Sequence, residues 1–154
     1  AAGSPGIYNT TKFAVRGMSE SLRYSLAKHG IGVSVLCPGL VKSYIYASDD
    51  IRPAALMDGA KAVDHEHIKQ LEGFHQTGME PDVIAQRVLD GMRANQAYIF
   101  SHPEFRDEVE ELFAEYMADF RDYPQDPGYE ARVGFEKFRR QRYKEARAAA
   151  RSAT

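Results

Sequence analysis

The chain has 154 residues, of which 44% are hydrophobic and 27% are charged, and its formal net charge is -2. This is the composition of a soluble globular protein, and the near-neutral charge gives no reason to expect a nucleic acid or a membrane surface as partner. No run of 18 apolar residues is present, so we expect no membrane-spanning helix. The single cysteine, Cys37, fits a reducing compartment, and we expect a cytoplasmic protein.

The first elements are predicted from hydrophobic spacing and turn residues. Residues 1–7 are rich in glycine and proline and predict a turn. Residues 8–29 carry apolar side chains at helical spacing and predict a long helix, which Gly30 is placed to end. Residues 31–37 are apolar and rich in β-branched side chains, which predicts a buried parallel strand that the Pro38-Gly39 turn closes.

The middle of the chain predicts a long loop followed by a second helix and strand. Residues 40–79 have little regular pattern beyond a short helix near 64–71, and segments of this length are usually functional. A helix over 81–95 begins with a proline, and a strand is expected over 97–100. The order of elements indicates an α/β fold. Because a sheet of two strands leaves open edges, we expect further strands before Ala1 and interpret the chain as the later part of a longer one.

The remainder of the chain, 104–154, is predicted to be helical and polarised in charge. Residues 104–122 hold eight acidic side chains and two arginines, whereas residues 130–154 hold eight basic and three acidic side chains. The basic segment could indicate nucleic acid, but the acidic helix is a nearer partner. We therefore expect the two helices to pair by charge, within or between subunits, with Phe135, Phe138 and Tyr143 on the buried face.

Tyr8 and Lys12 are the first candidates for chemistry. They stand four residues apart at the head of the first predicted helix, so both side chains project from one face. A nearby ammonium favours the phenolate form of a tyrosine, which suits proton exchange near neutral pH. The simpler interpretation is a packed tyrosine and a solvated lysine, because this spacing is common by chance.

The pair and its surroundings resemble the short-chain dehydrogenase/reductase family over residues 7–103. Tyr8-x-x-x-Lys12 is similar to the catalytic motif of that family, and residues 33–43, with Pro38-Gly39, are similar to its next-to-last strand and the turn that lines the nicotinamide. The resemblance implies the C-terminal part of a Rossmann-like, doubly wound parallel sheet over 1–103. Within it, 40–79 would be the substrate loop, and 104–154 would form a helical extension.

The resemblance also implies roles for single residues. Tyr8 would relay a proton to or from the substrate oxygen, and Lys12 would assist it and bind the nicotinamide ribose. Three further residues would contact the nicotinamide: Pro38, Gly39 and Val41. Ser43 stands where the family usually has threonine, and its hydroxyl could bind the cofactor in the same way. The cofactor would be NAD, with NADP not excluded, and no metal would be involved. The family's catalytic serine and glycine-rich turn are absent from these residues and would precede Ala1.

The wording of residues 3–17 and 43–46 most resembles the bacterial Cα-dehydrogenases of lignin β-aryl ether degradation. That resemblance implies an aromatic alcohol or ketone as substrate and a homodimer or homotetramer. Four residues of the loop could form an aromatic wall for the substrate: Tyr44, Ile45, Tyr46 and Phe74. An equally good interpretation is that they pack the loop onto the sheet. Met18, Leu22 and Leu26 would contribute to a subunit interface.

Two other functions stay open at this point. One is an NADPH-dependent carbonyl reductase of the same family, and the other is a cofactor-free interaction module if the chain begins at Ala1. The pair His65 and His67 does not indicate a metal, because alternate residues on a helix point apart. Cys37 is interpreted as a small core residue.

Overall fold

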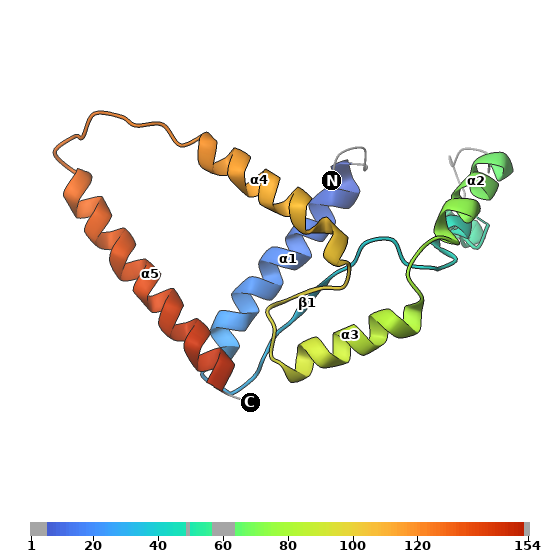
Figure 1. Cartoon of the computed structure of the whole chain (residues 1–154), viewed down its shortest axis with the longest axis horizontal. Coiled ribbons are helices and arrows are strands. Elements are labelled where there is room, and N and C mark those ends of the chain that lie inside the picture. Colours follow the sequence, from blue (N-terminus) through green and yellow to red (C-terminus); the bar gives the residue numbers. More distant parts are fainter. Residues whose placement is uncertain (1–5, 49, 57–63, 153–154) are drawn as a thin grey trace.

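The computed structural model describes residues 6–48, 50–56 and 64–152. In chain order its main elements are α1 (Gly6–Ala27), β1 (Val35–Cys37), α2 (His65–His75), α3 (Pro81–Arg93), β2 (Tyr98–Phe100), α4 (Arg106–Ala118) and α5 (Tyr129–Ser152) (Figure 1). Short 3₁₀ helices cover Ile45–Ala47, Ala54–Leu56 and Pro103–Phe105. Helices and strands thus follow each other in the predicted order.

The two strands form a small parallel sheet. Val35 faces Tyr98, Leu36 faces Ile99 and Cys37 faces Phe100. Because parallel strands require a long crossover, the chain passes through α2 and α3 between them. The predicted α/β class with a parallel sheet is confirmed.

The first strand is shorter than the predicted 31–37. The segment that faces residues 31–34 contains a turn at Asn95, whose φ of 48° interrupts any extended partner. Side chains supply the missing contacts, since the Ser34 hydroxyl donates to the Gln96 carbonyl at 2.6 Å. Backbone pairing therefore starts only at Val35, whose N–H donates to the Ala97 carbonyl at 2.9 Å.

A glycine ends α1, as predicted. Gly30 has a φ of 69°, which glycine adopts without steric cost. The N–H groups of Gly30 and Ile31 return to the carbonyls of Ala27 and Leu26 at 3.0 and 3.3 Å. Gly30 therefore closes the helix, although the helix proper covers Gly6–Ala27 rather than 8–29.

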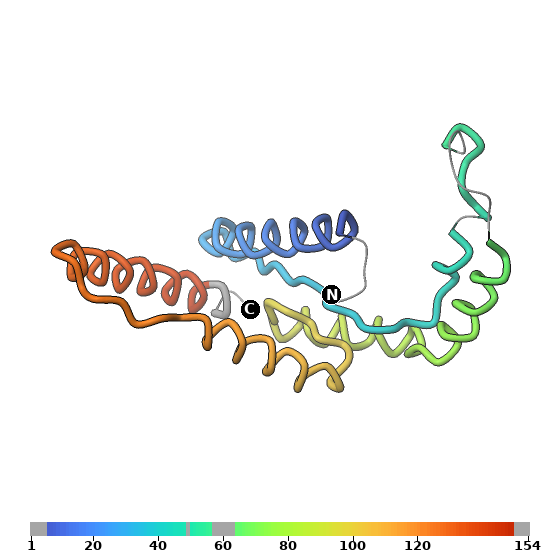
Figure 2. Tube along the Cα trace, turned by 90° about the horizontal axis from the view of Figure 1, so that it is seen from above, coloured from blue at the N-terminus to red at the C-terminus, as the bar shows by residue number. Residues whose placement is uncertain are grey.

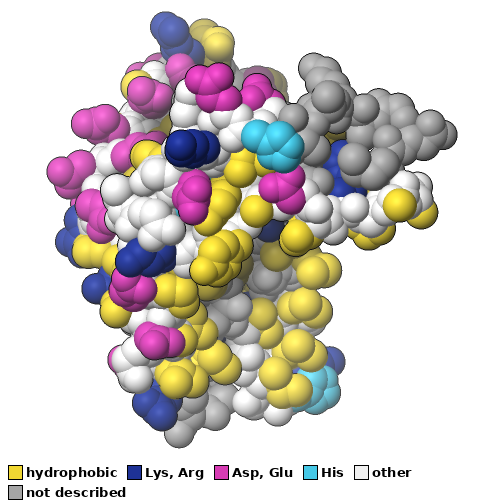
Figure 3. Space-filling model, turned by 90° about the vertical axis from the view of Figure 1, so that its right-hand side faces the viewer, with side chains coloured by type: hydrophobic (Ala, Val, Ile, Leu, Met, Phe, Trp, Pro, Cys, Tyr) yellow, Lys and Arg dark blue, Asp and Glu magenta, His cyan; other side chains and the backbone are white. Residues whose placement is uncertain are grey.

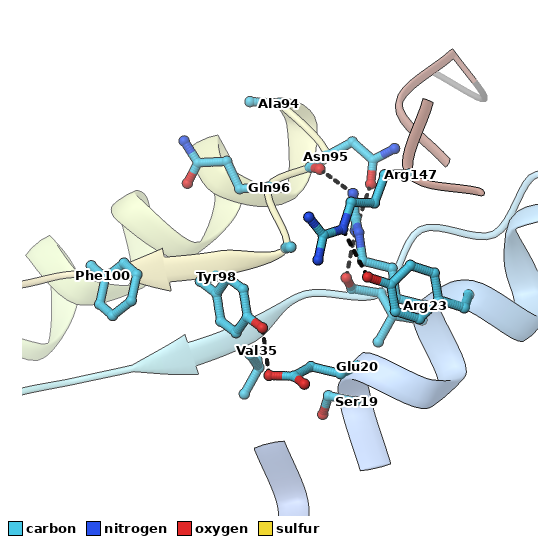
Figure 4. A pocket seen from close by; sticks show the side chains of 13 residues that line it. Ser19, Glu20, Arg23, Val35, Ala94, Asn95, Gln96, Tyr98, Phe100 and Arg147 are labelled. Carbon is cyan, nitrogen blue, oxygen red and sulfur yellow. Dashed lines mark hydrogen bonds between the residues drawn. The ribbon is translucent and has the colours of Figure 1, made fainter. Parts of the chain in front are cut away.

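A buried arginine fastens α1 to the turn before β2 (Figure 4). Arg23 is only 7% exposed. Its guanidinium donates to the Val33 carbonyl at 2.6 Å and to both the side-chain and backbone oxygens of Asn95, at 3.0 and 2.7 Å. These bonds hold α1 against both strand entrances and place its first turns relative to the sheet.

Helix α3 packs closely on the sheet at a glycine, Gly91. A Cβ on Gly91 would lie 2.7 Å from Cγ1 of Ile99, so the helix backbone rests directly on β2. Ile99 and Ile84 of α3 are among the most buried apolar residues that the structure describes. This packing holds β2 in place and, with it, the residues that follow β2.

The C-terminal helices correct one prediction. Figures 1 and 2 show α4 and α5 apart from each other, and α5 packs instead on α1. The rings of Tyr24 and Tyr143 lie 5.0 Å apart, and Arg147 donates to the Tyr24 hydroxyl at 2.7 Å. The predicted acidic–basic helix pair is therefore wrong within the chain.

The prediction that Phe135, Phe138 and Tyr143 form the buried face of α5 is also mostly wrong. Phe135 and Phe138 are 63% and 60% exposed, whereas Tyr143 packs on Tyr24. Only the last turns of α5 reach α1, since the linker after α4 carries the start of α5 away from the rest of the chain (Figure 1). The contact is confined to one end of the helix for that reason.

Candidate active site

Tyr8 and Lys12 lie together in the first turns of α1. The Lys12 ammonium is 5.2 Å from the centre of the Tyr8 ring, close enough for a cation–π contact. Tyr8 is 51% exposed, so its hydroxyl is open to a ligand. The Thr11 hydroxyl donates to the Tyr8 carbonyl at 2.7 Å and reinforces the same turn. The arrangement presents a phenol and an ammonium side by side at a helix start.

This helix start lies at the carboxyl end of the strands. The chain reverses after α1 and returns along it as β1 in both views (Figures 1 and 2). The beginning of α1 and the turn after β1 therefore share one end of the sheet. In open α/β sheets this is the end where ligands bind. Pro38 of that turn is exposed, whereas Gly39 is half-buried.

A buried histidine, His102, holds this turn. The Gly39 N–H donates to Nδ1 of His102 at 3.0 Å, and Nε2 of His102 lies 2.9 Å from the Leu40 carbonyl. A Cβ on Gly39 would lie 2.9 Å from the imidazole ring and would collide with the Phe105 ring. Sequence reasoning assigned His102 no role beyond the end of the second strand. Its position just after β2 could have indicated that it lies near the turn after β1, because paired parallel strands end side by side.

A second tie fixes the residues after the turn. Val41 pairs with Met79 in an isolated parallel bridge, in which the Met79 N–H donates to the Leu40 carbonyl and the Lys42 N–H donates to the Met79 carbonyl, both at 2.9 Å. In a parallel bridge the N–H and C=O of the central residue point away from the partner strand. The backbone polar groups of Val41 thus face the side opposite Met79. The Ser43 side chain is exposed nearby in the chain.

The aromatic residues of the loop gather around α2. Tyr46 lies 6.1 Å from Tyr44 and 5.7 Å from His75, and the ring of Phe74 is 6.1 Å from His75. Tyr44 and Phe74 are 81% and 60% exposed. Hydrophobic side chains are visible at the surface on this side of the molecule (Figure 3). The structure thus brings three of the four predicted loop residues into one cluster, whereas Ile45 has no ring and stays 61% exposed.

Tyr46 is the most enclosed member of this cluster. Its hydroxyl lies 3.4 Å from the Glu72 carboxylate, at the long end of hydrogen bonding. Partial burial and the Glu72 charge raise the pKa of Tyr46. The phenol therefore remains a neutral hydrogen-bond donor, and no role as a base is indicated for it.

A cavity lies on another part of the molecule. It has a volume of about 570 Å³ and opens between the second half of α1, the strand entrances and Arg147 of α5 (Figure 4). The Tyr98 hydroxyl donates to Glu20 at 2.5 Å, and this bond, with that from Arg16, lowers the pKa of Glu20. The residues that line the cavity do not include Tyr8, Pro38 or Gly39, so it is separate from the candidate site.

Cys37 lies at the end of β1 and is half-buried. Burial raises the pKa of its thiol, which disfavours the reactive thiolate. Within residues 6–48, 50–56 and 64–152 no group of three or more metal-binding side chains comes together. In the same ranges no helix is long and apolar enough to cross a membrane.

Comparisons with known proteins point to one family of enzymes. Residues 3–52 match the family model described as short chain dehydrogenase. The chain is 36% identical over 108 residues to the C alpha-dehydrogenase of a Sphingobium species, covering 70% of this chain and 35% of that protein. It is 30% identical over 125 residues to the CLA biosynthesis dehydrogenase/reductase of Lactiplantibacillus plantarum, covering 75% of this chain and 44% of that protein.

A solved structure agrees with the model over nearly the whole chain. That structure, described as a short-chain dehydrogenase from Novosphingobium aromaticivorans, is 52% identical with a TM-score of 0.75, covering 98% of this chain and 44% of that one. The chain thus spans less than half of the length of each of these three relatives. By sequence and by structure, the chain is a relative of the short-chain dehydrogenase/reductase family, and the predicted resemblance to that family is confirmed.

Proposed function

We propose that this chain carries part of the active site of an oxidoreductase that transfers a hydride between a secondary alcohol and NAD, giving the ketone. The observation that carries the proposal is the Tyr8–Lys12 pair, held at the end of the sheet where Pro38 and Gly39 follow β1. The kinship with short-chain dehydrogenases supports it.

In this mechanism Tyr8 handles the proton. Its phenolate oxygen takes the hydroxyl proton of the alcohol, and in the reverse direction its phenol returns that proton to the carbonyl oxygen. Lys12 lies on the next turn of the helix, with its ammonium 5.2 Å from the centre of the Tyr8 ring, and would assist this proton exchange. When bound, the cofactor supplies the acceptor for the hydride that leaves the carbinol carbon. The balanced result is a ketone, a reduced nicotinamide and one proton.

The residues present suit a nicotinamide. Its carboxamide has one acceptor and two donor hydrogens, and the outward N–H and C=O of Val41 offer the complementary pair. Lys12 would bind the ribose hydroxyls, and Pro38 would pack against the ring. Ser43, an exposed residue two positions after Val41, would add a polar contact through its hydroxyl. The proposed cofactor is NAD, with NADP as the alternative.

We further propose an aromatic substrate with a benzylic secondary alcohol, of the kind found in lignin-derived aryl ethers. The cluster of Tyr44, Tyr46 and Phe74 supports this, because exposed rings offer stacking and apolar contact to an aromatic ligand. Ile45 would widen the apolar rim. A homodimer or homotetramer is also part of the proposal, since α1 exposes Met18 and Leu22, which are 58% and 40% exposed.

The test uses the protein as its gene encodes it, with NAD and either 1-phenylethanol or 2-butanol, followed by absorbance of the reduced nicotinamide. We expect turnover with a preference for the aryl alcohol. Tyr8→Phe should lower kcat by about 10²- to 10⁴-fold, which is the usual contribution of a positioned proton donor. The Kd for NADH should stay within about twofold, because the ring and the helix remain.

Tyr116→Phe is the matched control. Tyr116 also lies on a helix and is 53% exposed, close to the 51% of Tyr8, so its variant should keep full activity. Substantial turnover by Tyr8→Phe would refute the proton role. A wild-type protein that neither binds NADH nor oxidises either alcohol would refute the proposed function as a whole.

A further inference from the structure

His102 is a buried histidine that joins the ends of the two strands. It is 5% exposed and follows β2 by two residues, just as Gly39 follows β1 by two. Three polar groups surround its ring: the Gly39 N–H, the Leu40 carbonyl and the Ser101 hydroxyl, which lies 2.9 Å from Nδ1. No step of the proposed chemistry has used this side chain.

The hydrogen bonds define how the ring is used. The Gly39 N–H is a donor, so Nδ1 must be the accepting nitrogen. Nε2 then carries the hydrogen and donates it to the Leu40 carbonyl at 2.9 Å. The Ser101 hydroxyl, which is fully buried, is a second donor to Nδ1. One imidazole thus grips the turn at two successive residues, through a donor on one and an acceptor on the other.

The ring also limits where the turn can lie. A Cβ at Gly39 would come within 2.9 Å of two ring carbons of His102, so the backbone of the turn rests on the imidazole. The Leu40 carbonyl accepts from Met79 N–H as well, at 2.9 Å. Rotation of the Pro38–Gly39 peptide would therefore break the bond from the Gly39 N–H, and rotation of the Leu40–Val41 peptide would break the bonds to the Leu40 carbonyl.

We propose that His102 is a positioning residue, which fixes the Pro38–Leu40 turn so that the backbone of Val41 meets the carboxamide of the nicotinamide. The inference rests on the proposed function. It goes beyond it by assigning a side chain at the end of β2, which touches neither substrate nor cofactor, to the orientation of the nicotinamide ring.

The test compares two ligands by calorimetry, NADH and ADP-ribose, which is the same dinucleotide without the nicotinamide. His102→Phe keeps the ring shape and loses both bonds. His102→Asn keeps an acceptor near the position of Nδ1, and His102→Gln keeps a donor near the position of Nε2. The protein is again the one its gene encodes.

We expect His102→Phe to raise the Kd for NADH about tenfold, because about one hydrogen bond to the nicotinamide would be lost. The Kd for ADP-ribose should stay within about twofold of the wild-type value. His102→Asn and His102→Gln should fall between Phe and wild type, because each restores one bond. NADH binding unchanged in all three variants would overturn the inference and leave the proposed function standing. An equal loss of both ligands in all three would also overturn it, in favour of a purely structural role. Wild-type protein that binds neither ligand would overturn both.

Discussion

Replacement of Arg23 by methionine tests how α1 is held on the sheet. The substitution keeps an unbranched apolar stem and removes a guanidinium that is 7% exposed and makes three hydrogen bonds. Hydrogen bonds from a charged donor contribute about 1.5–3 kcal/mol each, but three from one group are not additive. Arg23 also lines the cavity beside α1, so in the variant water can reach part of the carbonyls that have lost their donor. We therefore expect a loss of about 3 kcal/mol, the upper end of what one hydrogen bond from a charged donor contributes.

Urea unfolding followed by circular dichroism gives this difference directly. Arg93→Met is the matched control, because Arg93 is 72% exposed and its ion pair with Asp90 should contribute less than about 1 kcal/mol. Arg23→Lys should fall between, since one ammonium cannot reproduce the fork of donors. An Arg23→Met protein within about 1 kcal/mol of wild type would refute the reasoning that this arginine anchors α1.

Two further predictions concern packing and pH. Gly91→Ala should destabilise the protein by about 1–3 kcal/mol, because the new Cβ would meet Ile99 at 2.7 Å, whereas Gly73→Ala, with nothing within 4 Å, should raise the midpoint of thermal unfolding. The pKa of Glu20 is lowered by the bond from the Tyr98 hydroxyl, so its stabilisation is present above the ordinary value of 4.5 and is lost as the pH falls through the lowered value. Glu20→Gln should thus be less stable than wild type near neutral pH and equal to it in acid, and a gap that persists in acid would contradict this linkage.

Local patterns predicted most elements of the fold. The apolar spacing over 8–29 and the glycine at 30 predicted α1 and its end, since helix periodicity and capping depend on near neighbours. The order of helices and strands followed from the same signals. The start of β1 did not, because it depends on the turn at Asn95, which lies far along the chain.

The site was predicted in part. Tyr8 and Lys12 are one helical turn apart, so their proximity follows from sequence spacing alone. The grip of His102 on Gly39 spans 63 residues and involves a ring and a backbone, which leaves no local pattern to detect. Contacts of this kind become visible only when the register of the two strands is known.

The predicted pairing of acidic and basic helices failed for an electrostatic reason. Basic residues of α5 find acids close by in the sequence: Arg139 pairs with Glu136 of the same helix at 2.8 Å, and Arg132 pairs with Asp126, just before the helix, at 2.5 Å. Exposed charges farther apart than about 10 Å are largely screened by salt. Net charge therefore gave little information about which helix α5 would contact.

The bridge between Val41 and Met79 has a consequence for which sequence changes the segment between them can accept. Two backbone hydrogen bonds tie residues 40 and 42 to residue 79, and they do not depend on which side chains lie between. Insertions or exchanges within 44–77 can thus be accepted while both ends of the segment stay anchored, because longer closed loops cost little more entropy. Transplanting this segment from a relative should therefore leave the turn at Gly39 in place.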